Sequence, residues 1–598
     1  MEPESFDFVI VGGGIAGLVL AARLSEDANT QVLVIEAGED RTTDPRVNIP
    51  AMWPTLLGTS ADWNFKTVPQ EGLGHREISL PQGRLLGGSS ALNGLTFSAT
   101  SKANIDAWES LGNPGWDWSS FSESVKKSYT LPSQGPRTKG PIQLSVPEED
   151  SEWLQVWRKT LATLGYPTSA DSFSGEFYGA LTVTDAIDPI MKQRSFAGNA
   201  YLEPAKARSN LTIWTQTVAE RILFDQSEEI VATGVHCSAA GETKTVRARK
   251  EVLITAGAIN SPKLLELSGV GNAKLLQSLG IDVVIDSPQV GENLQNHPLC
   301  TLSFEVREQP GFETIDNLSR QNPNAIAAAM EAYSKQSGPF SRSGSNLAAQ
   351  LPLPEAKTEG GKQELKRLLH SLGSEIPHKP KSFTEAHKSF VHSVLTSPTE
   401  ASGCYTAIPG FAAATGDGLI APVPPGQESY LSIALLLAHP LSRGSVHIRS
   451  PSPSSPDLAI DPRYLTEPLD MEVFARHLQF VETIAMTDPL ASQLRLDGKR
   501  SPAAPPAGAF ADLNVAKDYI RNTAVGAHHF TSTCAMMPPE LGGVVDAQLR
   551  VYGCQNLRVC DASIIPITPR TNPQATVYGV AEHAAQIIKS GLRRLETT

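Results

Sequence analysis

The sequence predicts an α/β protein, and three neighbouring stretches near its start support this class. The run FDFVIV (6–11) is β-branched and aromatic, as expected of a buried strand, and it passes directly into the glycine-rich turn GGGIAG (12–17). The next residues, LVLAARLSED (18–27), have the apolar spacing of a helix. A second strand, QVLVIEAG (31–38), comes next. This strand–turn–helix–strand unit is typical of a Rossmann-like parallel sheet.

The glycines and the acid of this unit each have a physical role in dinucleotide binding. Gly12 permits the tight turn, Gly14 lets the main chain approach a pyrophosphate, and Gly17 lets helix and strand pack closely. The N-terminus of the helix that follows this turn offers unpaired N–H groups to phosphates. Glu36, about 20 residues further on, can accept hydrogen bonds from a ribose. We therefore predict dinucleotide binding rather than a purely structural turn, although the unit does not distinguish NAD from FAD.

Length, composition and charge indicate an ordinary globular protein and argue against some classes of partner. The 598 residues suggest several domains or one large composite unit, with 40% hydrophobic and 19% charged residues as in ordinary globular proteins. The formal net charge of −13 argues against a nucleic-acid or anionic-membrane partner, because such partners require basic surfaces. The six cysteines form no CxxC pair, so we expect no metal site and a reduced thiol pool.

The apolar N-terminal run could be mistaken for a targeting segment. Glu2, Glu4 and Asp7 precede or begin it, whereas a secretory signal needs positive charge there. Arg23 also interrupts it too early for a membrane span. We therefore expect a buried strand and helix, no membrane span and a cytoplasmic protein.

Four further blocks identify a family. GRLLGGSSALNG (83–94) predicts a second close approach of the main chain to a cofactor, although alone it could be an ordinary loop. The other blocks are GAINSPKLLELSGVG (257–271), DSPQVGENLQNHP (286–298) and the C-terminal stretch 544–588. In this order they resemble the glucose–methanol–choline (GMC) oxidoreductases, which use FAD. The wording NPQAT (572–576) is similar to that of the aryl-alcohol-oxidising fungal branch, and Thr100 departs from the first family signature.

The resemblance spans nearly the whole chain and implies its architecture. The class becomes α/β (α+β overall), with a Rossmann-like FAD-binding domain and a substrate-binding domain of antiparallel sheet and helices. The FAD-binding domain would be discontinuous and take residues 1–100, 200–300 and 520–598. The substrate-binding domain would take residues 101–199 and 301–519, where Pro- and Ser-rich segments would shape a pocket entrance.

The resemblance also implies the residues that hold FAD. Glu36 would bind the adenosine ribose, Asn93 would be central to the flavin contacts, and Val218 would touch the adenine through its main chain, although Val218 and Ala562 could equally be core residues. The implied cofactor-binding residues are Gly12, Gly14, Ile15, Gly17, Glu36, Ala37, Ser89, Asn93, Gly94, Leu95, Thr96, Val218, Asp561, Ala562, Pro573 and Gln574. Some members attach FAD covalently through a histidine just before the signature asparagine; Leu92 stands there, so we expect non-covalent FAD.

Two adjacent histidines are candidates for the catalytic base. Alcohol oxidation by hydride transfer needs a base for the hydroxyl proton, and histidine titrates in the useful range. In the family, the catalytic histidine lies five residues before the cysteine of a block similar to H-x-x-G-T-C-x-M, which corresponds here to His529 and Cys534, with Ser532 in place of the glycine. His528, one residue earlier, would point elsewhere and be structural.

The second catalytic position of the family falls on Asn572. An amide can hydrogen-bond the substrate oxygen but cannot take its proton, although Asn572 could also be a turn or cap residue before Pro573. The predicted function is FAD-dependent oxidation of an aromatic or hydroxymethyl-bearing alcohol to an aldehyde or ketone by hydride transfer to flavin N5, in secondary-metabolite biosynthesis. Dioxygen or another acceptor would reoxidise the flavin. The alternative is a non-redox lyase or cyclase of the same family that contains FAD.

Overall fold

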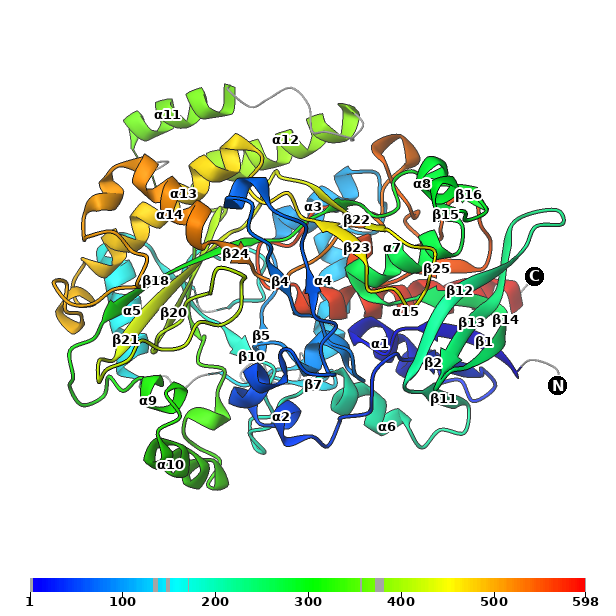
Figure 1. Cartoon of the computed structure of the whole chain (residues 1–598), viewed down its shortest axis with the longest axis horizontal. Coiled ribbons are helices and arrows are strands. Elements are labelled where there is room, and N and C mark those ends of the chain that lie inside the picture. Colours follow the sequence, from blue (N-terminus) through cyan, green and yellow to red (C-terminus); the bar gives the residue numbers. More distant parts are fainter. Residues whose placement is uncertain are drawn as a thin grey trace.

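The computed structural model describes residues 4–132, 138–146, 151–169, 171–354, 358–370 and 381–596. Two seven-stranded sheets organise these residues, one on each side of the molecule, and both chain ends lie beside the first sheet (Figure 1). One sheet is mostly parallel and the other almost entirely antiparallel. The predicted class is therefore confirmed, while the domain boundaries remain a prediction.

The first sheet collects strands from distant parts of the chain. Its order is β11-β2-β1-β14-β13-β12, and β25 pairs with β14. β14 is long enough to have two partners on one side, β13 along its first half and β25 at its end. The strands are β1 (Glu4–Val11), β2 (Val32–Ile35), β11 (Leu211–Trp214), β12 (Thr217–Asp225), β13 (Val231–Ala239), β14 (Glu242–Ile254) and β25 (Leu557–Val559).

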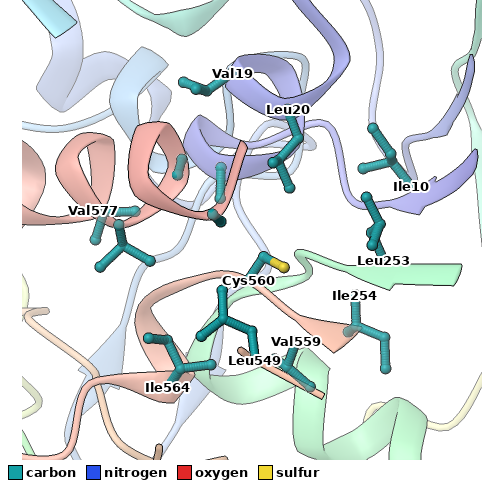
Figure 2. Close-up of a cluster of buried hydrophobic side chains, with 14 of the residues drawn as sticks. Ile10, Val19, Leu20, Leu253, Ile254, Leu549, Val559, Cys560, Ile564 and Val577 are labelled. Atoms are coloured by element: carbon teal, nitrogen blue, oxygen red, sulfur yellow. The ribbon is translucent and has the colours of Figure 1, made fainter. Parts of the chain in front are cut away.

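Apolar side chains from the two ends of the chain form the core beneath this sheet. β2 reads VLVI and is buried throughout, as parallel strands covered on both faces are. Ile10, Leu253 and Val559 from three neighbouring strands pack with Leu20 of α1 and Val577 of α15 (Figure 2). The C-terminal helix therefore completes the core that the N-terminal strand begins.

The second sheet has the order β24-β18-β21-β20-β19-β9-β8, with antiparallel neighbours except for the parallel pair β8 and β9. Its strand β21 reads YLSIALLL and is almost wholly buried. The strands are β8 (Thr168–Ser169), β9 (Gly179–Thr182), β18 (Pro298–Glu305), β19 (Leu347–Leu351), β20 (Gly403–Ile408), β21 (Tyr430–Leu437) and β24 (Val525–Gly526). A smaller sheet holds β17 (Glu292–Leu294), β22 (Gly444–Ile448) and β23 (Leu458–Asp461).

Amphipathic helices cover these sheets. α13 buries a stripe of apolar residues against β21, and the carboxylate of Asp470 in its first turn accepts main-chain N–H bonds from Leu441 and Ser442, both 2.7 Å long. In Figure 1, α11 and α12 lie outside α13. The principal helices are α1 (Ile15–Leu24), α3 (Lys102–Ser110), α4 (Trp118–Ser128), α5 (Glu152–Thr163), α7 (Gly257–Leu267), α10 (Pro323–Ser334), α11 (Glu359–His370), α12 (Lys381–Thr396), α13 (Pro468–Ala485), α14 (Leu513–Thr523) and α15 (Gln574–Glu596). In the part of the chain that the structure covers, none of the helices has the length and apolar character to cross a membrane.

Candidate active site

The glycine turn between β1 and α1 is shaped by two different constraints. Gly12 has φ +108°, and a β-carbon on it would lie 2.5 Å from the carbonyl oxygen of Thr255, so a larger residue is excluded by conformation and by space. A β-carbon on Gly17 would lie 1.9 Å from the carbonyl oxygen of Gly12, which is the close helix–strand contact that the sequence predicts. Gly14 differs, because the nearest atom to its β-carbon would be 3.9 Å away. The space beside Gly14 is therefore open to a ligand.

Glu36 lies at the end of β2, beside this turn. Its Oε2 accepts a hydrogen bond from the main-chain N–H of Gly13 at 2.8 Å, and its Oε1 accepts one from Gly38 at 2.7 Å. Burial raises the pKa of this carboxyl to about 7 against the effect of these bonds. Each oxygen keeps a lone pair for a ribose hydroxyl. The main-chain N–H of Thr217 donates to the Glu36 carbonyl at 2.9 Å, which places Val218 next to it.

The loop that contains Ser90 and Asn93 is fixed by hydrogen bonds from the buried side chain of Arg194. The guanidinium of Arg194 donates to Asn93 Oδ1 at 2.9 Å, to the Asn93 carbonyl at 2.8 Å and to the Ser90 carbonyl at 3.1 Å. Burial lowers the pKa of Arg194 to about 9. The amide nitrogen of Asn93 donates to Gln574 Oε1 at the start of α15. Two segments that are 481 residues apart in sequence thus meet at one point.

Asp561 lies two residues after the end of β25 and anchors the start of α7. Its Oδ2 accepts from the Gly257 main chain at 2.8 Å and from Ser261 Oγ at 2.6 Å, and its Oδ1 accepts from Ser563. The carboxylate is thus engaged within the protein. Any contact that Asp561 and its neighbour Ala562 make with a cofactor would come from the main chain.

One cavity of about 440 Å³ connects these features. Of the residues predicted for cofactor binding and catalysis, only Gly17 is absent from its wall, in agreement with its packing role. The predicted residues in the wall are Gly12, Gly14, Ile15, Glu36, Ala37, Ser89, Asn93, Gly94, Leu95, Thr96, Val218, His529, Asp561, Ala562, Asn572, Pro573 and Gln574.

The features of this cavity fit an FAD. The open space at Gly14, the N-terminus of α1 and the carboxylate of Glu36 suit a pyrophosphate and a ribose. The wall then continues through the Asn93 loop to His529, which leaves room for a long ligand with its reactive end at the imidazole. The donor set and the glycine cradle thus agree with the sequence prediction, while the role of each residue remains a prediction.

His529 is positioned by a short ladder between two distant segments. Thr531 and Gln295 exchange main-chain hydrogen bonds of 3.1 and 3.2 Å, and the Ala527 N–H donates to the carbonyl of His297 at 2.9 Å. Between them, the main-chain N–H of His529 donates to the side chain of Asn296 at 2.8 Å. Residues 295–297 therefore fix the main chain that presents the imidazole.

The imidazole of His529 has a partner on each side. Its Nδ1 lies 2.8 Å from Nδ1 of His297, and its Nε2 lies 3.1 Å from the amide nitrogen of Asn572. Burial, then the neighbouring His297 and His528, hold the pKa of His529 well below its usual value. The ring is therefore neutral at pH 7 and lies beside the amide of Asn572, while the catalytic roles of the two residues remain a prediction.

His528 does not point away from the site, contrary to expectation. It lines the same cavity, because a positive φ of 62° turns the main chain at this residue. Its Nδ1 is buried and has no hydrogen-bond partner among the residues that the structure describes, and burial lowers the pKa of the ring to about 4. His528 is thus a second neutral imidazole in the wall of the pocket.

The cavity wall also contains an apolar part. Trp53, Trp63, Phe65 and Phe530 contribute aromatic rings; Trp63 and Phe65 are stacked with centroids 5.8 Å apart. Trp53 lies close to the Asn93 loop, with 3.9 Å between its ring and a β-carbon placed on Gly94. Leu419 and Ile420 line the wall although they are 44% and 54% exposed, so they stand at its edge.

Charged side chains in the wall are all engaged by groups of the protein. Besides Glu36 and Asp561, the wall contains Lys263, whose Nζ donates to the carbonyls of Pro453 and Ser455, both at 3.2 Å. Each of these side chains therefore has hydrogen-bond partners in the protein, but the partners are neutral groups and do not cancel its charge. The apolar and aromatic side chains would favour a neutral ligand.

Sequence reasoning missed His297, Arg194 and the aromatic side chains of the wall. His297 belongs to the block DSPQVGENLQNHP, so a signal existed, but the block was used only to identify a family. Trp63 and Phe65 belong to ADWNFKTVPQ (61–70), a further segment that resembles the family, whereas Arg194 belongs to none of these segments. Thr100, where the first signature departs, is buried outside the wall; its hydroxyl accepts from the Arg570 main chain at 3.1 Å, two residues before Asn572.

Comparison with known proteins shows the family and the fold of this chain. The chain matches the GMC oxidoreductase family at residues 6–299 and 440–581. It is 36% identical to the dehydrogenase citC of Monascus ruber, over 98% of this chain and 96% of that protein. Its fold is similar to that of an FAD-dependent oxidoreductase from Chaetomium thermophilum, with a TM-score of 0.86, 29% identity, and 98% and 100% of the two chains covered. A fungal aryl-alcohol oxidase has a TM-score of 0.83 at 26% identity, with 98% and 99% covered.

Proposed function

Because this chain belongs to the GMC oxidoreductase family, we propose that it is an FAD-dependent enzyme that oxidises the CH–OH group of a neutral alcohol, with His529 as the base. The substrate class would be aromatic or hydroxymethyl-bearing alcohols, with an aldehyde or ketone as product. A role in secondary-metabolite biosynthesis and a cytoplasmic location belong to the same proposal.

A single observation supports this function more than any other. The neutral imidazole of His529 and the amide of Asn572 lie 3.1 Å apart in the wall of one cavity that also contains the glycine turn of α1 and the Asn93 loop. A base and a hydrogen-bond donor are thus placed in the same space as the expected binding site of an FAD. This arrangement suits removal of a proton from a hydroxyl group.

Each residue of the pair would have its own task. When bound, FAD accepts the hydride that leaves the alcohol carbon. Nε2 of His529 takes the hydroxyl proton, which it can do at neutral pH because burial keeps this ring unprotonated. The amide of Asn572 donates a hydrogen bond to the substrate oxygen and so holds the hydroxyl against His529. The aromatic wall excludes water from this pair.

The lining of the pocket supports a neutral, apolar substrate. Trp53, Trp63, Phe65 and Phe530 offer ring faces and edges, and the lining carboxylates and ammonium group are bound to other groups of the protein. A charged group of a substrate that lay against these rings would be desolvated, which is costly. The family leaves the acceptor open, so dioxygen or another oxidant would complete the cycle.

We also propose that FAD is held without a covalent bond. Leu92, which precedes Asn93, is buried in the cavity wall, and its aliphatic side chain cannot form a bond to the flavin. Acid precipitation of the purified protein should therefore release all of the yellow chromophore into the supernatant. Flavin that stays with the precipitate would contradict this part of the proposal.

Anaerobic mixing with alcohols tests the redox function directly. Benzylic and hydroxymethyl-aromatic alcohols should bleach the oxidised flavin absorbance, and each equivalent of flavin reduced should yield one equivalent of aldehyde. Readmission of air or of an artificial acceptor should restore the absorbance. Substrate consumption without bleaching would contradict the proposal and support the lyase or cyclase alternative.

A further inference from the structure

A buried pair of imidazoles lies behind the pocket. His297 is fully buried and is not part of the cavity wall, yet its Nδ1 lies 2.8 Å from Nδ1 of His529, and the two rings meet edge to face at 84°. A contact of this length between two ring nitrogens requires one proton, so one nitrogen donates and the other accepts. The direction of this bond decides which nitrogen of His529 has a lone pair for the substrate.

The other nitrogen of His297 settles the direction. Its Nε2 lies 3.1 Å from the carbonyl oxygen of Ala438, and a carbonyl can only accept. Nε2 of His297 must therefore have the hydrogen. Burial lowers the pKa of His297 to about 4 although the carbonyls of Ala438 and Pro569 raise it, so the ring is neutral and has no second hydrogen. Its Nδ1 is thus an acceptor, and Nδ1 of His529 is the donor.

The contact between His529 and Asn572, on the side of the pocket, leads to the same tautomer of His529. With the hydrogen on Nδ1, Nε2 of His529 has a lone pair, and the neighbour of Nε2 is the amide nitrogen of Asn572, a donor, at 3.1 Å. From Asn572 through His529 and His297 to the Ala438 carbonyl, every hydrogen bond therefore runs in the same direction. With this tautomer, no contact in the series pairs two donors or two acceptors.

We infer that His297 is a positioning residue that sets the tautomer of His529 and so presents the Nε2 lone pair to the alcohol. The inference rests on the function proposed above, because it assigns a cause to the orientation of the proposed base. His297 touches neither the pocket nor the reacting atoms.

The same geometry predicts the state of the pair after proton transfer. The hydroxyl proton moves to Nε2 of His529, the O–H electron pair forms the new C=O bond, and the C–H electron pair leaves with the hydride. Nδ1–H of the resulting imidazolium still donates to the neutral His297. Because the series ends at a carbonyl, which cannot take a proton, His297 stabilises the cation and does not pass the proton on.

The electrostatic surroundings of the pair contain other titratable or charged groups. His528 faces His529, and His439 with Arg570 behind it lies near His297; burial and these neighbours keep the pKa of His439 well below its usual value. The histidines of this group are thus neutral near pH 7. We therefore expect substitution of His297 to act on His529 through the lost hydrogen bond rather than through a change of charge.

A comparison of the His297→Asn and His297→Leu variants measures the effect of the hydrogen bond from His529, because the two new side chains have nearly the same size. In His297→Asn, the amide oxygen can accept from Nδ1–H of His529, whereas His297→Leu offers no acceptor. The leucine variant should have kcat/KM at least about tenfold lower than the asparagine variant, as is typical when the partner that orients a histidine is lost. The acid limb of its pH profile should also lie at lower pH, since the imidazolium loses an acceptor.

Histidine NMR of the FAD-bound enzyme without substrate tests the inference apart from the reaction. With ring-¹⁵N-labelled histidine, the signal that disappears in His529→Gln should show a protonated Nδ1 and an unprotonated Nε2, and His297→Leu should change it. A protonated Nε2 in the unsubstituted enzyme would overturn the inference even if alcohols bleach the flavin. Failure of every alcohol to bleach it would instead reject the proposed function and leave the tautomer readable.

His477→Leu is the matched control. This histidine is also fully buried, but its ring nitrogens bind Ser402 Oγ at 2.9 Å and the Tyr405 hydroxyl at 2.6 Å, outside the cavity wall. Its loss should lower thermal stability without changing the pH profile or the His529 signal. If His477→Leu and His297→Leu changed both readouts alike, the role of His297 would be structural only.

Discussion

The two ends of the cavity are built in different ways. At the end near α1, main-chain groups do most of the work: the Glu36 carboxylate is oriented by the N–H groups of Gly13 and Gly38, which lie 23 and 2 residues away. At the other end, side chains do it: His529 contacts His297, 232 residues away, and Asn572, 43 residues away. A motif of consecutive residues can specify the first end, whereas the second exists only after the two sheets have come together.

The electrostatics differ in the same way. At the first end, Glu36 accepts one main-chain N–H at each oxygen, and Asp561 accepts N–H and O–H bonds from several residues. The imidazole of His529 at the other end is kept neutral by burial and has one neutral partner at each ring nitrogen. Substitutions at the first end should therefore affect folding and cofactor retention, and those at the second should affect turnover. Variants at both ends can test this division.

Replacement of His529 should have the largest effect on turnover. In His529→Gln the side chain at position 529 can no longer accept the hydroxyl proton, so kcat should fall by about 10²–10⁴-fold. The bound flavin and the thermal midpoint should change little, because the side chain lines the pocket. His528→Gln is the matched variant and should cost less; a larger loss there would mean that the base has been misassigned.

At the end near α1, substitutions of Gly17 and Gly14 should distinguish an effect on protein stability from an effect on FAD binding. Gly17→Ala places a β-carbon 1.9 Å from the Gly12 carbonyl oxygen and should lower the free energy of unfolding by about 3 kcal/mol or more. Gly14→Ala meets nothing nearer than 3.9 Å and should leave the stability of the apoprotein within about 1 kcal/mol. It should nevertheless weaken FAD binding, measured by fluorescence titration of the apoprotein. Equal loss of stability in the two variants would reject this distinction.

Asn572 should have a smaller effect than His529, because it supplies one hydrogen bond. Asn572→Ala should lower kcat/KM by about tenfold. In Asn572→Asp a carboxylate would stand beside Nε2 and raise the pKa of His529, so the acid limb of the kcat/KM profile should move to higher pH. An unchanged limb would show that the two side chains do not interact in the working enzyme.

The smallest predicted effect concerns stability at the junction of α7 and β22. His447 binds Glu266 at 2.7 Å and Glu292 at 3.2 Å; burial alone would lower its pKa, but the two carboxylates raise it from 6.5 to about 9. Because the folded pKa is the higher one, the stabilisation is complete below pH 6.5 and is lost as the pH rises through 9. His447→Gln should therefore lower the thermal midpoint by about 2–4 °C at about pH 6.

That difference between the His447 variant and the unsubstituted protein should shrink by about pH 9.5, as measured by scanning fluorimetry. A difference that stays constant with pH would show that the histidine contributes by packing and not by charge. Flavin content should be the same in both proteins.

The extent to which the sequence anticipated the site depends on distance along the chain. Gly12, Gly17 and Glu36 could be assigned because a strand, a turn and a helix impose fixed spacings on neighbouring residues. His529 was assigned only through its distance from Cys534 in a block that resembles a family pattern. His297 and Arg194 could not be assigned, because their roles depend on contacts with residues 232 and 101 positions away.

His528 shows the limit of local reasoning most clearly. Adjacent side chains on an extended segment point to opposite sides, which led to the expectation that only His529 faces the pocket. The positive φ at His528 breaks that alternation. Such a φ is set by the surrounding chain and is not encoded by the two histidines.

The amino-acid sequence by itself determined the dinucleotide-binding unit, because strand burial, glycine conformation and the spacing to Glu36 are properties of a few dozen consecutive residues. Only the tertiary structure decided which ring nitrogen of His529 has the free lone pair on which its proposed role as base depends. That choice depends on a carbonyl of Ala438 at the end of β21 and on the ladder between residues 295–297 and 527–531. A hydrogen-bond direction is fixed by the groups at both of its ends, and here these groups come together only when the chain is folded.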